Sequence, residues 1–156
     1  MEIERKYLVQ SPPADYETWP FHQIEQAYLN TEPVIRIRRE DESFYMTYKS
    51  KGLLAREEYN LPLTKAAYDH LLPKADGIIL TKKRYLKPID GTELTIELDI
   101  FSGAYEGLML AEVEFPSLEA AENFTPPDWF GEDVTLSGKY QNSRLSLGSL
   151  SPESGS

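Results

Sequence analysis

The chain has 156 residues and a mass of 17.8 kDa, a length that suits one compact domain, and its 40% hydrophobic content argues against disorder. Its 26 acidic and 16 basic residues give a net charge of −10, which disfavours a surface that follows nucleic-acid backbones. The lack of cysteine excludes disulfides and thiolate chemistry, and two histidines, His22 and His70, are too few for a multi-histidine metal site.

Apolar and polar residues alternate with a period of two along most of the chain, which indicates β-strands. The predicted strands are 2–9, 24–30, 34–40, 43–50, 55–61, 79–87, 93–101 and 108–115. Prolines predict loops at 10–21 and around Pro126. Three helices are expected: 65–72, capped by Thr64 and ended by Pro73, then 118–124, capped by Ser117, and 138–147, which has the weakest signal. The sequence therefore predicts an α+β, mainly β domain over 1–147 and a disordered tail over 148–156.

One face of nearly every predicted strand is charged, and the charges occur in groups of one sign. In strand 2–9, Glu2, Glu4 and Lys6 share one face while Ile3 and Tyr7 share the other. The same alternation aligns Arg36 with Arg38, Arg56 with Glu58, Lys82 with Arg84, Glu97 with Asp99, and Glu112 with Glu114, and it places Lys49 on the face of Tyr45 and Thr47. For a single strand, a sheet face in water would explain the pattern. Like charges two residues apart repel each other, so a barrel with its charged face inside explains the whole set better.

An interior of both signs points to a polyphosphate and a metal ion. Lysine and arginine bind phosphate oxygens, and clustered carboxylates suit Mg²⁺ or Mn²⁺. Unpaired buried charge is very costly, so such an interior should be wet and occupied by ions. Metal and polyphosphate together are the components of phosphoryl transfer. No glycine-rich phosphate loop offers a competing site.

The order of these charged motifs resembles the CYTH superfamily, the triphosphate tunnel metalloenzymes. Residues 2–6 (EIERK) resemble the E-x-E-x-K signature at the N-terminus. The segments that follow in family order are 35–38, 47–50, 56–58, 82–85, 97–99 and 110–115, and 139–142 resembles the closing helix that plugs the tunnel. The resemblance covers about residues 2–147 and is nearest to short bacterial members that hydrolyse inorganic triphosphate.

The resemblance implies an eight-stranded antiparallel closed tunnel, covered and plugged by a few helices, and metal-dependent hydrolysis of inorganic triphosphate to pyrophosphate and phosphate. It implies Mg²⁺ or Mn²⁺ as cofactor, held by Glu2, Glu4, Glu112 and Glu114 with Glu97 and Asp99 assisting. It assigns triphosphate binding to Lys6, Arg36, Arg38, Lys49, Arg56, Lys82 and Arg84. Arg56 can pair with Glu58 instead. Lys6, Lys82 and the metal-side acids such as Glu4 are the candidates for activating the water.

Other functions stay open at this point: a class IV adenylate cyclase, a thiamine or nucleoside triphosphatase, or a polyphosphate-binding module without turnover. The inward positions show no comparable set of aromatic or amide residues for reading a base, which favours inorganic triphosphate over ATP. The expected partner is a small-molecule triphosphate, with neither nucleic acid nor membrane, and a homodimer is left open. The N-terminus does not resemble a signal peptide and no apolar run approaches the ~18 residues of a membrane span, so a cytoplasmic location is expected.

Overall fold

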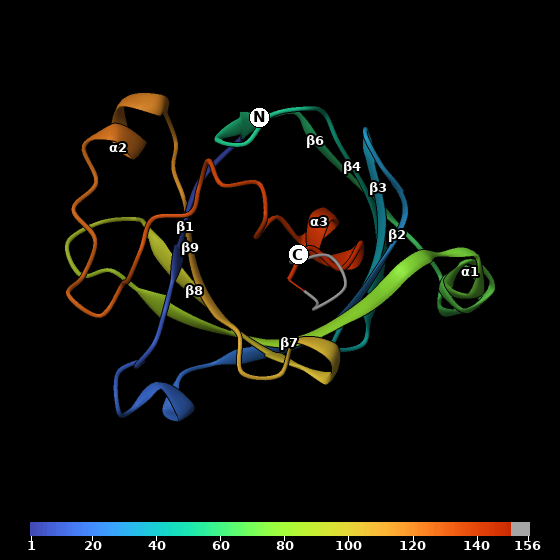
Figure 1. Cartoon of the computed structure of the whole chain (residues 1–156), viewed down its shortest axis with the longest axis horizontal. Helices are drawn as coiled ribbons and strands as arrows, with labels where there is room; N and C mark the ends of the chain where they lie inside the picture. The colour runs from blue at the N-terminus through green and yellow to red at the C-terminus, as the bar shows by residue number, and fades with distance from the viewer. Residues whose placement is uncertain (151–156) are drawn as a thin grey trace.

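A computed structural model describes residues 1–150, in which nine antiparallel strands form one sheet that curves into a barrel (Figure 1). The strands are β1 Glu2–Leu8, β2 Phe21–Thr31, β3 Val34–Glu40, β4 Ser43–Lys49, β5 Ala55–Arg56, β6 Glu58–Pro62, β7 Asp76–Pro88, β8 Thr95–Ser102 and β9 Met109–Glu114. Their spatial order is β5-β1-β9-β8-β7-β2-β3-β4-β6. The mainly β barrel that the sequence predicted is confirmed.

The strand count is nine and not the eight predicted, because the expected strand 55–61 is divided at Glu57. Its first part, β5, pairs with β1 through Glu2 opposite Arg56, and its second part, β6, pairs with β4 through Lys49 opposite Glu58. The two parts therefore stand at opposite ends of the strand order while remaining consecutive in the chain. One short segment thus joins both edges of the sheet and nearly closes the barrel.

Three short α-helices accompany the sheet: α1 Lys65–Leu71, α2 Leu118–Glu122 and α3 Asn142–Ser146. The Thr64 and Ser117 side chains accept hydrogen bonds from the backbone N–H of Ala67 and Ala120, as expected of N-caps. The α-helix ends at Leu71, next to the end predicted before Pro73, and the chain continues into a 3₁₀ turn, Leu72–Lys74. The predicted helix 138–147 is shorter because Gln141 is extended, and α3 begins only after it. Two further 3₁₀ turns are Tyr16–Thr18 and Gly103–Tyr105.

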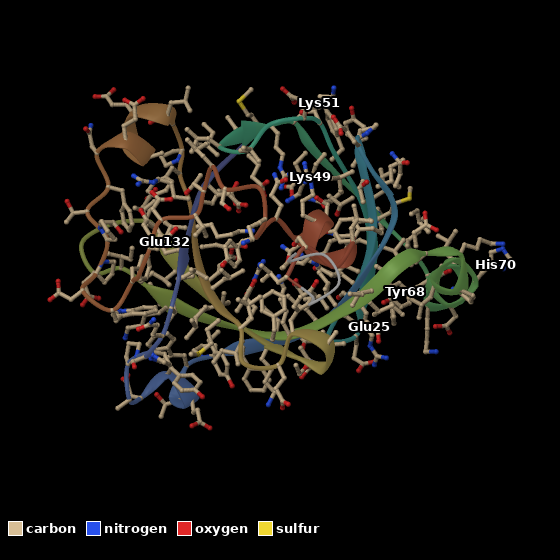
Figure 2. All side chains as sticks on the ribbon, in the orientation of Figure 1. Glu25, Lys49, Lys51, Tyr68, His70 and Glu132 are labelled. Carbon is tan, nitrogen blue, oxygen red and sulfur yellow. The ribbon has the colours of Figure 1, made fainter. Side chains whose placement is uncertain are left out.

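Two of the three buried apolar clusters lie outside the barrel wall, and the third, which includes Leu80, Leu110 and Leu145, packs around α3 on the inner side of the sheet. On one side, α2 and the loop that follows it cover β1 and β9, where Tyr7, Val113 and Phe130 belong to one buried cluster (Figure 1). On the other side, α1 packs against β3 and β4, with Tyr68 buried against neighbouring apolar residues. Figure 2 shows Glu25 and Tyr68 close together there, and the Tyr68 hydroxyl donates to Glu25 Oε1 over 2.8 Å. The apolar strand residues in these outer layers alternate with charged residues along the chain. The charged residues therefore point into the barrel.

Helix α3 lies on the inner side of the sheet, against β7 and β2 (Figure 1). Its position is fixed in part by the Tyr105 hydroxyl, which donates to the backbone oxygen of Leu145 over 2.5 Å. Within residues 1–150, no helix is both long and apolar enough to span a membrane. Residues 151–156 of the predicted tail 148–156 lie outside the described part of the chain.

Candidate active site

The charged faces predicted from alternation point into the barrel. A cavity of about 230 Å³ lies there, lined among others by Glu2, Glu4, Arg36, Arg38, Lys49, Arg84, Glu97, Glu112 and Glu114. Figure 2 shows Lys49 on the inner side of the ring, whereas Lys51 lies at its outer edge. The other four predicted site residues are joined to this lining by ion pairs: Lys6 with Glu112, Arg56 with Glu2, Asp99 with Arg84, and Lys82 with Asp99. The barrel therefore brings all thirteen predicted side chains into one connected set.

The deepest part of the set is a network of fully paired charges on β7, β8 and β9. Arg84 holds Asp99 with two hydrogen bonds of 2.8 and 2.9 Å, and Lys82 Nζ lies 2.6 Å from the same carboxylate. These contacts follow from the register, which places Arg84 opposite Asp99. Glu112 accepts from Arg84 at 3.3 Å and pairs with Lys6 at 3.2 Å. Burial raises the pKa of Asp99, but the charges of Arg84 and Lys82 outweigh it and hold that pKa below its ordinary value.

A second group of ion pairs surrounds Glu2, where β5 and β6 close the barrel. Lys49 Nζ lies 3.0 and 3.1 Å from the two Glu2 oxygens, and Arg56 Nε lies 3.3 Å from one of them. Glu58 pairs with Lys49 at 3.4 Å. The alternative pairing of Arg56 with Glu58 was therefore wrong, because these residues belong to different strands, β5 and β6, that pair with different neighbours.

Among the six acids predicted for the site, two have no cationic side chain within ion-pair distance in the described part of the chain. Glu4 and Glu114 stand opposite each other on β1 and β9. Burial, followed by the negative charges of Glu112 and Glu2, raises the pKa of Glu4 to about 8. Burial and Glu2 likewise raise the pKa of Glu114. This pair of acids is therefore the part of the barrel where an added positive charge would be most stabilising.

Arg36 and Arg38, on β3, have uncharged hydrogen-bond partners, and the one carboxylate within ion-pair distance among the described residues is Glu40, 3.8 Å from Arg38 Nη1. Arg36 Nη2 donates to Thr47 Oγ1 over 3.1 Å, and its buried Nε has no hydrogen-bond partner among residues 1–150. Arg38 Nε donates to Gln26 Oε1 over 2.9 Å and Nη1 to the Tyr45 hydroxyl over 3.2 Å. Burial, followed by the neighbouring positive charge of Arg38, lowers the pKa of Arg36. Uncompensated guanidinium charge in a cavity is suited to an anion with several oxygen atoms.

The uncharged partners were not singled out in the sequence, although the alternation contains them. Gln26 and Thr47 are buried, and Tyr45 and the more exposed Asn60 line the cavity, so the expectation of few inward aromatic and amide groups was too narrow. Thr47 and Tyr45 share the face of Lys49, which was the available signal. Gln26 lies in β2, whose inward residues carry no charge pattern, so nothing marked it.

The segment that resembled a plug contacts two of the bases at the inner end of the cavity. Lys6 Nζ donates to the backbone oxygen of Tyr140 over 3.0 Å, and Lys82 Nζ donates to Asn142 Oδ1 over 3.4 Å. Lys82 has no exposed surface, and burial lowers its pKa to about 7 although Asp99 opposes the shift. Burial also acts to lower the pKa of Lys6, but Glu112 and Glu4 outweigh it and raise that pKa.

The donor set fits a hard divalent cation in its chemistry, although it is not gathered around one point. Within residues 1–150, no three histidine, cysteine or acidic side chains are close enough together to hold a metal ion. The reason is visible in the pairs described above, since Glu2 and Glu112 are drawn towards lysine and arginine. Glu4 and Glu114 supply anionic oxygen with no competing cation within ion-pair distance.

Comparison with known proteins places this arrangement in a family. An inorganic triphosphatase of Nitrosomonas europaea is 39% identical over 150 residues, covering 94% of this chain and 97% of the relative. One of Acetivibrio thermocellus is 31% identical over 150 residues, covering 92% of each. A crystal structure of an inorganic triphosphatase matches with a TM-score of 0.70 at 36% identity, covering 94% of this chain and 95% of the other. The CYTH domain model matches residues 1–146, and the chain belongs to the CYTH family.

Proposed function

We propose that this protein is an enzyme that hydrolyses inorganic triphosphate to pyrophosphate and phosphate inside the barrel. The observation that carries the proposal is the pair Arg36 and Arg38, buried in the cavity with uncharged hydrogen-bond partners and with one guanidinium N–H donor unused. A buried donor without a partner costs about 1–3 kcal/mol, so an anion that accepts from it is favoured. The names of the two relatives, both inorganic triphosphatases at 39% and 31% identity, support the same substrate.

The triphosphate would be bound by the inward bases. We assign this role to Arg36, Arg38, Lys49 and Arg84, which line the cavity, and to Lys6, Arg56 and Lys82, which are joined to the same set by ion pairs. The transferred phosphoryl group carries spread negative charge in the transition state, and fixed cationic donors stabilise that charge without reorganising. The seven bases supply such donors from opposite sides of the barrel.

We further propose that Glu2, Glu4, Glu112 and Glu114 hold Mg²⁺ or Mn²⁺, with Glu97 and Asp99 assisting. When bound, a divalent cation neutralises phosphate charge and polarises the phosphoryl oxygens. Glu4 and Glu114 are suited to this because burial, and then neighbouring acids, raise their pKa values, so a bound cation would stabilise their charged forms. Glu2 and Glu112 would have to exchange their bonds to Lys49 and Lys6 for bonds to the metal.

Among the candidates for activating water, Lys82 is supported best. Its pKa of about 7 lets a fraction of the amine be neutral near physiological pH, whereas the raised pKa of Lys6 keeps that amine protonated. Glu4, with a pKa of about 8, holds a proton at neutral pH until a cation lowers that pKa. If kcat of the wild type changes with pH near pH 7 and this change is absent in Lys82→Arg, the assignment to Lys82 is supported.

A substrate panel tests the function. With Mg²⁺ and with Mn²⁺, kcat/KM should be higher for inorganic triphosphate than for ATP or thiamine triphosphate, and no cyclic AMP should form. ATP turnover to a cyclic product would favour a cyclase instead, and binding of triphosphate without turnover would favour a binding module. The cytoplasmic location, the oligomeric state and the absence of nucleic-acid or membrane partners stay predictions from the sequence.

A further inference from the structure

We propose that Gln26 and the Thr47–Asn60 pair are positioning residues that orient Arg38 and Arg36 while leaving their positive charge uncompensated for the substrate. This inference rests on the proposed function, since it concerns how the same cavity recognises triphosphate. It separates two groups of bases: those held by carboxylates and those held by uncharged side chains.

The carboxylate-held group has its charge largely neutralised within the protein. Lys49 pairs with Glu2 at 3.0 Å, Lys82 with Asp99 at 2.6 Å and Arg84 with Asp99 at 2.8 Å. For Arg36 and Arg38, the one ion pair within the described residues is Arg38 to Glu40 at 3.8 Å, a longer contact to a side chain that is 28% exposed. The two arginines on β3 are therefore the bases with most charge left for a ligand.

Gln26 fixes Arg38 by an uncharged contact. Its side chain is fully buried, its Oε1 accepts from Arg38 Nε at 2.9 Å, and its Nε2 donates to the Tyr28 hydroxyl at 3.4 Å. The register places Gln26 directly opposite Arg38 on the neighbouring strand. A carboxylate at this position would make a stronger bond and neutralise the charge of Arg38, as Asp99 does with Arg84. An amide orients the guanidinium but leaves its charge unneutralised.

Thr47 and Asn60 position Arg36 by two successive uncharged hydrogen bonds. Thr47 Oγ1 lies 2.6 Å from Asn60 Oδ1, an acceptor, so the threonine hydroxyl donates to Asn60. With its hydrogen directed there, the same oxygen offers its lone pairs to Arg36 Nη2 at 3.1 Å. Thr47 is fully buried and stands opposite both Arg36 and Asn60 on the adjacent strands. The unused Arg36 Nε is then left as a donor for a ligand oxygen.

The replacement Gln26→Glu tests this directly, because it keeps the shape and the acceptor but adds a charge beside Arg38. The control is Gln23→Glu, the same change on the same strand at an exposed position. Binding of sodium triphosphate would be measured by titration calorimetry in metal-free buffer, with melting curves of the unliganded proteins recorded in parallel. We expect Gln26→Glu to fold and to bind triphosphate at least about tenfold more weakly, while Gln23→Glu binds as the wild type does. Equal affinity of the two variants would overturn the proposal.

Thr47 gives a second test that does not depend on adding a charge. Thr47→Val removes the hydroxyl at constant shape, whereas Thr47→Ser retains it, and Thr81→Val removes a hydroxyl that is bonded to Ser102 outside the cavity. We expect the valine variant at position 47 to raise KM for triphosphate about tenfold or more, and the serine variant to stay within about threefold of the wild type. Equal effects of valine and serine would show that the hydroxyl does not position Arg36. If the wild type itself neither binds nor hydrolyses triphosphate, the proposed function fails instead.

Discussion

Replacing Glu4 by glutamine should remove activity and, at alkaline pH, stabilise the unliganded fold. The pKa of Glu4 is raised from an ordinary value near 4.5 to about 8, first by burial and then by Glu112 and Glu2. Below pH 4.5 this carboxyl is protonated in both the folded and the unfolded chain. Between pH 4.5 and 8 the unfolded chain loses the proton first, so stability falls as pH rises. Glutamine carries no charge and does not incur this loss.

The size of the effect follows from the shift. Each pKa unit corresponds to about 1.4 kcal/mol, so the full shift would be about 5 kcal/mol. Glu4 is partly exposed in the barrel and solvent screens its charge, so we expect Glu4→Gln to be more stable than the wild type by about 1–3 kcal/mol at pH 9. At pH 4 the two should differ little.

The measurement is urea unfolding of both proteins in metal-free buffer at pH 4 and pH 9. Glu57→Gln is the matched control, because Glu57 is an exposed acid between β5 and β6. It should leave stability nearly unchanged at both pH values. A Glu4→Gln protein that is no more stable than the wild type at pH 9, or equally shifted at both pH values, would refute the reasoning. Full activity at low metal in this variant would refute its metal role.

Two further predictions concern phosphate binding. Arg38→Ala removes a buried charge-assisted contact worth about 1.5–3 kcal/mol, so kcat/KM for triphosphate should fall roughly 10–150-fold. Lys87→Ala, whose Nζ lies 5.8 Å from the Trp19 ring outside the cavity, should change it little, and similar losses at both sites would contradict the inward assignment. Triphosphate with Mg²⁺ should raise the melting temperature of the inactive Glu4→Gln or Glu114→Gln protein, and an unchanged value at saturating ligand would count against a site in the barrel.

The sequence predicted which side chains enter the barrel because strand pleating imposes a strict alternation. Lys82 and Arg84 are two residues apart in β7, so they lie on the same face whichever strands β7 pairs with. Which partners they meet depends on strand order and register, and alternation carries no information on either. The division of 55–61 into β5 and β6 was missed for that reason, and with it the pairing of Arg56 with Glu2. Gln26 was missed because an uncharged residue on an inward face looks like any other polar strand position.

The same limit explains why the sequence did not show that two of the proposed metal ligands already form ion pairs within the protein. Glu2 and Glu112 were assigned to a metal ion, yet each contacts a lysine, Lys49 or Lys6, that was assigned to phosphate. Within the barrel the two proposed ligands, metal and triphosphate, therefore compete with the same ion pairs. Binding of either one frees a partner for the other, so their affinities should be coupled.

This coupling can be tested at Lys49, which forms an ion pair with Glu2. Lys49→Met removes the nearer of the two cations that pair with Glu2 and leaves Arg56 in place. Mn²⁺ should therefore bind more tightly than to the wild type when no triphosphate is present, while triphosphate in metal-free buffer should bind more weakly. Lys51→Met is the matched control, since Lys51 is exposed and its partner Glu32 lies outside the set (Figure 2). It changes net charge equally and should leave both affinities nearly unchanged. Titration of free Mn²⁺ by electron paramagnetic resonance measures the first quantity and calorimetry the second. If the two lysine variants changed Mn²⁺ affinity alike, the gain would reflect net charge alone, and Glu2 would not be a ligand held back by Lys49.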